Sequence, residues 1–156
     1  MKHNPVAMVL ATWFGCGLAP KAPGTMGALG ALPFAWMWLA TVQGPPLWML
    51  LPVVLLTGPA VWAANRVAAE RGLDDPQIVV VDEVLGTWIA IAGATVLNWK
   101  SVALAFVLFR LFDITKPQPV RWLERLHGGT GIIADDLMAG VYAALVLFLA
   151  GWFNLY

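Results

Sequence analysis

Residues 22–65 read APGTMGALGALPFAWMWLATVQGPPLWMLLPVVLLTGPAVWAAN, a run without one ionisable side chain. A helix needs about 20 apolar residues to cross the hydrocarbon core of a bilayer. The run is therefore long enough for two crossings, and Gln-Gly-Pro-Pro at 43–46 is a strong turn signal between them. We expect two membrane-spanning helices here, at roughly 24–43 and 46–65.

The composition of the whole chain supports a membrane protein. Of the 156 residues, 12% are charged and 60% are hydrophobic, and the mean hydropathy is +0.77. A soluble domain usually has about 25% charged residues. Zero net charge gives no basic patch for nucleic acid, and one cysteine excludes an internal disulfide or a zinc cluster of several thiolates. The length suits a single membrane-embedded domain, residues 1–156.

The rest of the chain also alternates between apolar and charged blocks. We expect a second hairpin with helices at about 82–98 and 101–116, and a last helix at about 135–154. Residues 4–14 suit a short helix lying at the membrane interface. The predicted fold class is all-α, a polytopic membrane bundle of four to five transmembrane helices.

The positions of the charges predict which side of the membrane carries a functional site. All charged residues except Lys2, Lys21 and Lys100 fall in segments 66–83 and 110–136. Two hairpins place these segments and Lys21 on one side and leave Lys100 alone on the other. The positive-inside rule makes the charged side cytoplasmic. We therefore expect a site on the cytoplasmic face, where nearly every ionisable group gathers.

Two acidic pairs, Asp82-Glu83 and Asp135-Asp136, are each predicted to begin an apolar helix. Acids in a first turn complement the helix dipole, which is the purely structural interpretation. Both pairs are expected on one membrane face, however, and carboxylates at a membrane boundary are costly and usually functional. Four converging carboxylates repel one another unless a cation lies between them. Oxygen ligands alone favour a hard ion, Mg²⁺ before Zn²⁺.

The surroundings of the two pairs share a pattern. Each pair follows three apolar residues and precedes a glycine, Gly86 or Gly140. An old duplication and two unrelated helices with acidic first turns both explain this. A third acidic pair, Asp74-Asp75, precedes Pro76 and is interpreted as a structural turn.

The segment 109–117, FRLFDITKP, carries two cations and one acid at helical spacing. Arg110, Asp113 and Lys116 lie on neighbouring parts of one helix face, and Pro117 ends the helix. One interpretation is an ion pair at the interface with the cations extended toward lipid headgroups. The other is two cations for a phosphate and a carboxylate for metal binding or nucleophilic chemistry.

Two glycine-containing loops complete the candidate site. Residues 20–27, PKAPGTMG, precede an apolar helix, and free amides near Gly24 suit an anion beside Lys21 and Thr25. The segment has no Walker A pattern. In the other loop, 127–131, His127 precedes two glycines, which suits acid–base work or phosphate contact; a plain turn is the alternative.

Taken together, these motifs resemble the phosphatidylglycerophosphatase A family. The resemblance is carried by residues 23–27 (PGTMG), 81–83 (VDE) with Gly86, the 109–117 segment, and 127–131 (HGGTG) followed by Asp135-Asp136 and Gly140. It extends from about Phe14 to Tyr142. It implies a bacterial inner-membrane, Mg²⁺-dependent lipid phosphatase of phospholipid biosynthesis, which removes the terminal phosphate of phosphatidylglycerol phosphate to give phosphatidylglycerol.

Combined with the charge pattern, the resemblance implies roles for single residues. Mg²⁺ is expected on the four acids of the two pairs. Three roles are open for Asp113. It is expected to be a nucleophile that forms an aspartyl phosphate, a further metal ligand, or the base for a water held by the metal. The remaining candidates are expected to hold the phosphate or to protonate the leaving oxygen, a role that suits His127. They are Lys21, Gly24, Thr25, Arg110, Lys116 and His127.

Three other functions are compatible with parts of the sequence. Another lipid phosphate monoester, such as phosphatidic acid, would need the same groups. A small ion- or proton-coupled transporter would carry its charges near the bilayer midplane, whereas here they are expected at helix ends. A membrane assembly subunit without catalysis explains the small residues but not the clustered acids.

Overall fold

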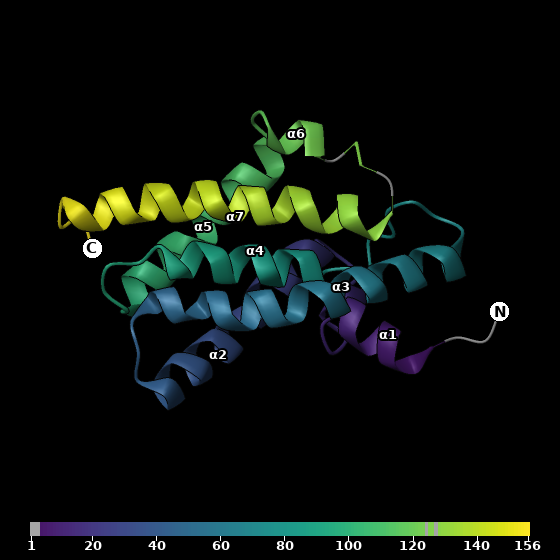
Figure 1. Cartoon of the computed structure of the whole chain (residues 1–156), viewed down its shortest axis with the longest axis horizontal. Coiled ribbons are helices and arrows are strands. Elements are labelled where there is room, and N and C mark those ends of the chain that lie inside the picture. Colours follow the sequence, from purple (N-terminus) through teal and green to yellow (C-terminus); the bar gives the residue numbers. More distant parts are fainter. Residues whose placement is uncertain (1–3, 124, 127) are drawn as a thin grey trace.

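The structure is a computed structural model that describes residues 4–123, 125–126 and 128–156. Within these ranges the chain is helical and contains no strand, which confirms the all-α prediction. The helices run roughly along one long axis, with the first and last described residues at opposite ends (Figure 1). The elements are α1 (Pro5–Ala11), η1 (Cys16–Leu18), α2 (Pro23–Val42), η2 (Pro46–Met49), α3 (Leu50–Arg71), α4 (Val81–Ala92), α5 (Trp99–Thr115), α6 (Val120–Leu123) and α7 (Gly129–Trp152).

Three helices of the described chain are long and apolar enough to cross a membrane. They are α2, the combined η2–α3 segment from Pro46 to Arg71, and α7. Helix α4 has 12 residues and α5 has 17, so they extend about 18 Å and 25 Å, less than the hydrocarbon thickness of about 30 Å. The expected four to five crossings go beyond these three and stay a prediction.

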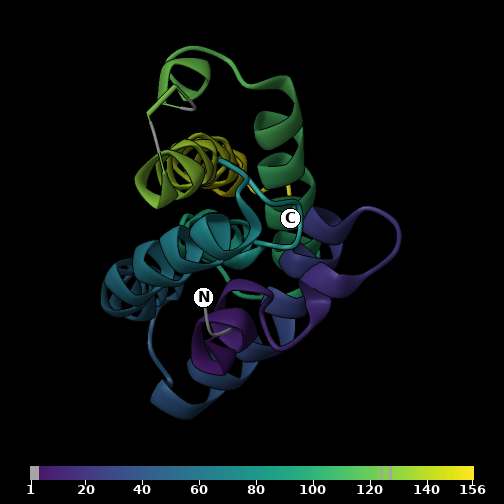
Figure 2. The same cartoon turned by 90° about the vertical axis from the view of Figure 1, so that its right-hand side faces the viewer.

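Helix α4 is the centre of the bundle. Viewed from the end, the other helices surround it (Figure 2), and every residue of α4 except Glu83 is buried. A helix that is apolar on all sides is stable only inside a larger structure. Its first turn carries Asp82 and Glu83 as predicted, so an acidic helix start lies inside the bundle.

Several helix boundaries differ from the predicted ones. Helix α4 ends at Ala92 rather than near 98, and α3 continues to Arg71 rather than ending near 65. Helix α7 begins at Gly129, six residues before the predicted start. Its first amide, that of Gly129, donates to Asn65 Oδ1 of α3 at 2.8 Å. This cap from another helix supports a start at glycine, which local sequence signals do not favour.

Two tryptophans, one in the segment after α1 and one in α4, form hydrogen bonds to the backbone of α2. Trp13 Nε1 donates to the Gly30 carbonyl at 3.1 Å, and Trp88 Nε1 donates to the Ala31 carbonyl at 2.9 Å. Both carbonyls lie just before Pro33, which lacks an amide and interrupts the helical hydrogen bonds of α2. These tryptophans therefore bind polar backbone in the core.

Candidate functional site

A cavity of about 500 Å³ opens at the charged end of the bundle. Its wall comes from the amino-terminal ends of α2, α4 and α7, the carboxyl-terminal end of α5, and the loop before α4. It brings together both predicted acidic pairs, the three charged residues of the 109–117 segment, and Gly24. Its charged and polar lining consists of Asp75, Gln77, Asp82, Glu83, Arg110, Asp113, Lys116, Asp135 and Asp136.

Three carboxylates from two helices meet in this cavity. One oxygen each from Asp82, Glu83 and Asp136 lies within 4.8 Å of the other two. Asp82 and Asp136 are buried, and Glu83 is half-buried. Like charges this close repel strongly in a buried environment. The arrangement therefore calls for a compensating positive charge.

Two oxygens of this group also lack hydrogen-bond donors. Asp82 Oδ1 and Glu83 Oε2 are buried and have no partner in the part of the chain that the structure describes. An unsatisfied buried acceptor costs about 1–3 kcal/mol, and more when it is charged. Burial raises the pKa of Asp82 well above its usual value, and the nearby Glu83 raises it further. The oxygen-only donor set thus fits a hard divalent cation such as Mg²⁺.

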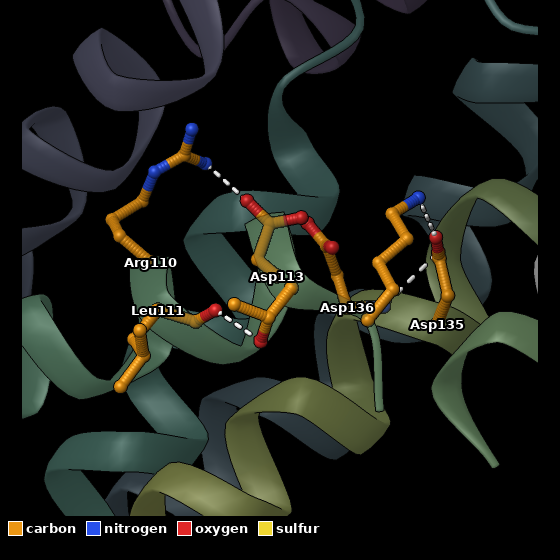
Figure 3. A network of polar contacts seen from close by, with 7 residues as sticks. Arg110, Leu111, Asp113, Asp135 and Asp136 are labelled. Carbon is orange, nitrogen blue, oxygen red and sulfur yellow. Dashed lines mark hydrogen bonds and ion pairs between the residues drawn. The ribbon is translucent and has the colours of Figure 1, made fainter. Parts of the chain in front are cut away.

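The fourth acid of the two pairs has a different partner. Lys116 Nζ donates to Asp135 Oδ2 at 3.0 Å, and the amide of Asp136 donates to Asp135 Oδ1 at 3.0 Å (Figure 3). Asp135 lies on the cavity wall but outside the group of three carboxylates. Its side chain is therefore placed to hold Lys116 at the cavity.

A second ion pair lies on the opposite side of the carboxylate group. Arg110 Nη1 donates to Asp113 Oδ2, and the Asp113 carboxylate points toward that of Asp136 (Figure 3). Arg110 Nε is buried and has no hydrogen-bond partner among the described residues. Both cations of the 109–117 segment thus border the cavity, each paired with one carboxylate.

Close packing of α4 on α7 explains why the acids converge. A Cβ atom added at Gly86 would lie 2.7 Å from the carbonyl oxygen of Asp136, and one added at Gly140 would lie 3.0 Å from Gly86 Cα. Only glycine permits such close backbones, as at small-residue crossings in membranes. The two glycines that follow the acidic pairs in the sequence therefore face each other in space.

The start of α2 approaches the same acids through another glycine. A Cβ atom added at Gly24 would lie 3.1 Å from Glu83 Cδ and 3.2 Å from Arg110 Nη1. Among the described residues, the two other candidates of this loop do not line the cavity: Lys21 is exposed and Thr25 is half-buried. The loop therefore contributes its glycine and backbone to the site.

The structure corrects one expectation about the acids and adds a cavity residue that was not expected. Asp135 and Asp136 do not begin a helix, because Asn65 caps α7 six residues earlier and places them in its second turn. Asp75, interpreted as a turn residue, does lie in a bend of the chain, and it also lines the cavity together with Gln77. No motif marks either residue; only the path of the loop before α4 brings them there.

One candidate of the sequence analysis is not placed. His127 lies outside the described residues. Its neighbours Gly128 and Gly131 line a second cavity of about 280 Å³, together with Asp74, Asp75 and Arg125. The two cavities share Asp75 and Ile132. The His127 role stays a prediction.

Comparisons with known proteins agree on one family. A family model described as phosphatidylglycerophosphatase A matches residues 9–151. The chain is 40% identical over 146 residues to phosphatidylglycerophosphatase A of Escherichia coli K12, covering 92% of this chain and 82% of that protein. It is 36% identical over 146 residues to the protein of the same name from Haemophilus influenzae Rd, covering 93% and 88%.

A further relative has a different name. A protein of Bacteroides thetaiotaomicron, provisionally named a phosphatidylinositol-3-phosphatase, is 41% identical over 159 residues, covering 93% of each chain. No solved structure matches this chain significantly. With a family model matched over nearly its whole length and relatives of 36% and 40% identity that bear the family's name, the chain belongs to the phosphatidylglycerophosphatase A family.

Proposed function

We propose that this protein hydrolyses phosphatidylglycerol phosphate to phosphatidylglycerol and phosphate with Mg²⁺, as a step of phospholipid biosynthesis. Family membership makes it a phosphatase with a phospholipid substrate. One observation carries the Mg²⁺ part of the proposal: Asp82, Glu83 and Asp136 converge within 4.8 Å. Two of these carboxylates have buried oxygens that receive no hydrogen bond from the residues that the structure describes.

Asp82, Glu83 and Asp136 would hold the ion, with Asp135 beside them. A bound Mg²⁺ neutralises charge on a phosphoryl group during its transfer. The protein's own contribution is to fix the carboxylates on two rigid helices, so that little rearrangement accompanies the reaction. Their burial also keeps bulk water away from the oxygens, which strengthens electrostatic interactions there.

Arg110 and Lys116 would bind the phosphate dianion of the substrate. Each already faces the cavity and is held by a carboxylate, Arg110 by Asp113 and Lys116 by Asp135. These acids fix the cations in place within a cavity whose lining carries more acidic than basic side chains. Phosphoryl transfer depends mainly on such positioning and charge neutralisation.

Asp113 would take a direct part in the reaction. It lies beside Arg110 and points toward Asp136, which suits a nucleophile, a further metal ligand, or a base that activates water. His127 would protonate the leaving glycerol oxygen, as its neighbourhood of glycines suggests. Lys21 and Thr25 remain proposed phosphate contacts on the basis of the family resemblance.

The position of the cavity suits a lipid substrate in the bacterial inner membrane. Acids and cations gather at one end of the bundle, where α2 and α7 begin, and the long apolar helices extend away from it. Most Lys and Arg residues occupy this end, which favours a cytoplasmic site by the positive-inside rule. A phosphate at the membrane surface would enter the cavity while its acyl chains stay in lipid.

The decisive experiment measures phosphate release in detergent micelles, with Mg²⁺ or with EDTA. Phosphatidylglycerol phosphate is compared with phosphatidic acid and with phosphatidylinositol 3-phosphate, because one relative carries the latter name. We expect release that needs Mg²⁺ and is fastest for phosphatidylglycerol phosphate. Equal release from all three lipids would contradict the named substrate, and undiminished release in EDTA would contradict the metal.

Two matched variants separate the site from general effects of substitution. Asp82→Asn removes one carboxylate of the converging group, and we expect it to abolish release while the protein still inserts into membranes. Asp74→Asn makes the same change at an exposed acid outside the main cavity and should keep activity. If the folded wild-type protein releases no phosphate from any lipid, the transporter hypothesis gains support.

A further inference from the structure

The amino-terminal segment, residues 4–22, leaves the charged end of the bundle and returns to it. At its start, the Asn4 amide donates to Glu70 Oε1 at 3.1 Å, one residue before α3 ends. At its end, the chain enters α2 at Pro23, beside the cavity. Between these points, α1 runs inward and the chain reverses through three left-handed residues, Trp13, Phe14 and Gly15 (φ 45°, 53° and 95°).

The reversal packs against the apolar part of α2. Trp13 is only 4% exposed, and besides its bond to Gly30 it forms an edge contact with Trp88 at 5.4 Å between ring centroids. Phe14 stacks on Phe34 at 5.6 Å. Gly30 and Phe34 lie seven and eleven residues after Pro23, about 10 Å and 16 Å along the helix. The aromatic side chains of the reversal therefore contact α2 below the charged end, while the backbone on either side of it, at Ala11 and Gly17, contacts the loop before α4.

The outer surface of the segment is apolar. Val6 is 65% exposed and Phe14 is 64% exposed, and Val9 is exposed between them. No charged residue occurs from residue 4 to residue 20. This surface continues directly into that of α2 through the stacked Phe14 and Phe34, and α2 is one of the three candidate membrane spans.

The amides of the reversal donate hydrogen bonds inside the protein. The amides of Trp13, Phe14 and Cys16 donate to the carbonyls of Leu10, Val9 and Trp13, at 3.1, 2.9 and 3.2 Å. The Gly15 amide donates to Thr12 Oγ1 at 3.1 Å, and that hydroxyl donates to the Met8 carbonyl at 2.8 Å. Non-helical backbone is tolerated at membrane depth only where it is buried in protein or lines a water-filled cavity. In the reversal, Thr12, Trp13 and Gly17 are buried, and Gly15 and Cys16 are half-buried.

We propose that residues 4–22 form a re-entrant segment whose outer face contacts the acyl chains of the lipid leaflet at the charged end. Val6 lies near the headgroups, and Phe14 lies deepest. This differs from a helix lying flat at the interface, in which both residues have the same depth. The segment also supports the loop before α4, because the Val80 amide donates to the Ala11 carbonyl at 2.8 Å.

Spin-label accessibility tests the proposal without reference to phosphatase activity. Single cysteines are introduced as Val6→Cys and Phe14→Cys in a Cys16→Ala background, and the labelled protein is reconstituted in vesicles of phosphatidylethanolamine and phosphatidylglycerol. Leu145→Cys on exposed α7 serves as the lipid reference, and Gln77→Cys at the cavity mouth serves as the water reference. Collision rates are measured with oxygen, which concentrates in hydrocarbon, and with nickel ethylenediaminediacetate, which stays in water.

We expect the ratio of oxygen to nickel collisions at Phe14 to approach that at Leu145, with Val6 between Phe14 and Gln77. Equal ratios at Val6 and Phe14 would indicate a flat interfacial helix and overturn the proposal. A ratio at Phe14 equal to that at Gln77 would place the reversal in water, and low collision rates with both reagents would mean that protein covers it. Val9→Cys, which leaves the Phe14 stack intact, replaces Phe14→Cys if that variant does not fold.

Discussion

Replacing Gly86 with alanine adds a methyl group where α4 crosses α7. The added carbon would lie 2.7 Å from the Asp136 carbonyl oxygen and 2.8 Å from Phe109 Cζ, whereas ordinary contact begins at 3.4 Å. Phe109 is fully buried, so its ring can shift only by displacing packed neighbours. The two helices must therefore separate by about 0.7 Å, because packed interiors hardly compress.

This separation should affect activity more than folding. Overpacking of a core typically costs about 1–3 kcal/mol of stability. Asp82 and Glu83 lie within one turn of Gly86 on α4, and Asp136 lies on the other helix, so the carboxylate group widens with the crossing. Displacement of catalytic groups by about 1 Å can reduce turnover by about 10²-fold. We expect Gly86→Ala to lose one to two orders of magnitude in kcat.

The measurement is the rate of phosphate release from phosphatidylglycerol phosphate at saturating Mg²⁺, together with the melting temperature in the same detergent. Gly58→Ala is the matched control, because Gly58 is exposed on α3 and no described atom approaches its added carbon within 4 Å. Wild-type kcat in a folded Gly86→Ala protein would refute the argument that this crossing sets the carboxylate geometry. An equal loss in Gly58→Ala would show that any glycine replacement is harmful.

Further predictions concern the charged groups. Mg²⁺ should raise the melting temperature of the wild type but not of Asp82→Asn, as a thermal-shift titration would show. Lys116→Met should lower kcat about 10²-fold, and an unchanged rate would remove Lys116 from phosphate binding. Gly24→Ala should displace the Glu83 carboxylate and lower activity, with a stability change below about 1 kcal/mol because that side chain is flexible. Since burial raises the pKa of Asp82 and Glu83, protons compete with Mg²⁺, and calorimetric titration should show Mg²⁺ affinity that is lost as the pH falls, at a higher pH than for carboxyls with ordinary pKa values.

The sequence was sufficient to predict the elements that depend on long-range composition. The uncharged run of 22–65 contains α2 and most of α3, and the turn at 43–46 separates them. The block 109–117 ends its helix at Thr115, before Pro117, as the proline predicts. These features follow from local chemistry and from the thickness of a bilayer, so no tertiary information was needed.

The parts that the sequence did not reveal depend on contacts between distant residues. The start of α7 is set by Asn65, whose side chain comes from another helix. Asp75 and Gln77 reach the cavity through the path of a loop. In the sequence, Gly86 and Gly140 each follow an acidic pair, and this repeat has two possible explanations. The sequence does not show which helices cross, so it does not predict that the two glycines contact each other.

The same limit explains the division among the four acids. Their convergence was predicted from shared sidedness, and three of them do meet. Asp135 binds Lys116 instead of joining the other three acids. This contact depends on the left-handed conformation of Lys116, which ends α5 and turns the chain away from the helix. Such a detail follows from backbone geometry at a single residue.

The burial of α4 has a consequence for how the protein is made. This helix is about 18 Å long and begins with two acids, so it is a poor candidate for independent insertion into lipid. Its place in the bundle depends on partners on both sides of it in the chain, since α2 and α3 precede it and α5 and α7 follow it. During synthesis, the glycine face of α4 therefore stays uncovered until α7, which follows it in the chain, has been made and packs against it. A chain that terminates before Gly129 would therefore leave the glycine face of α4 without its α7 partner.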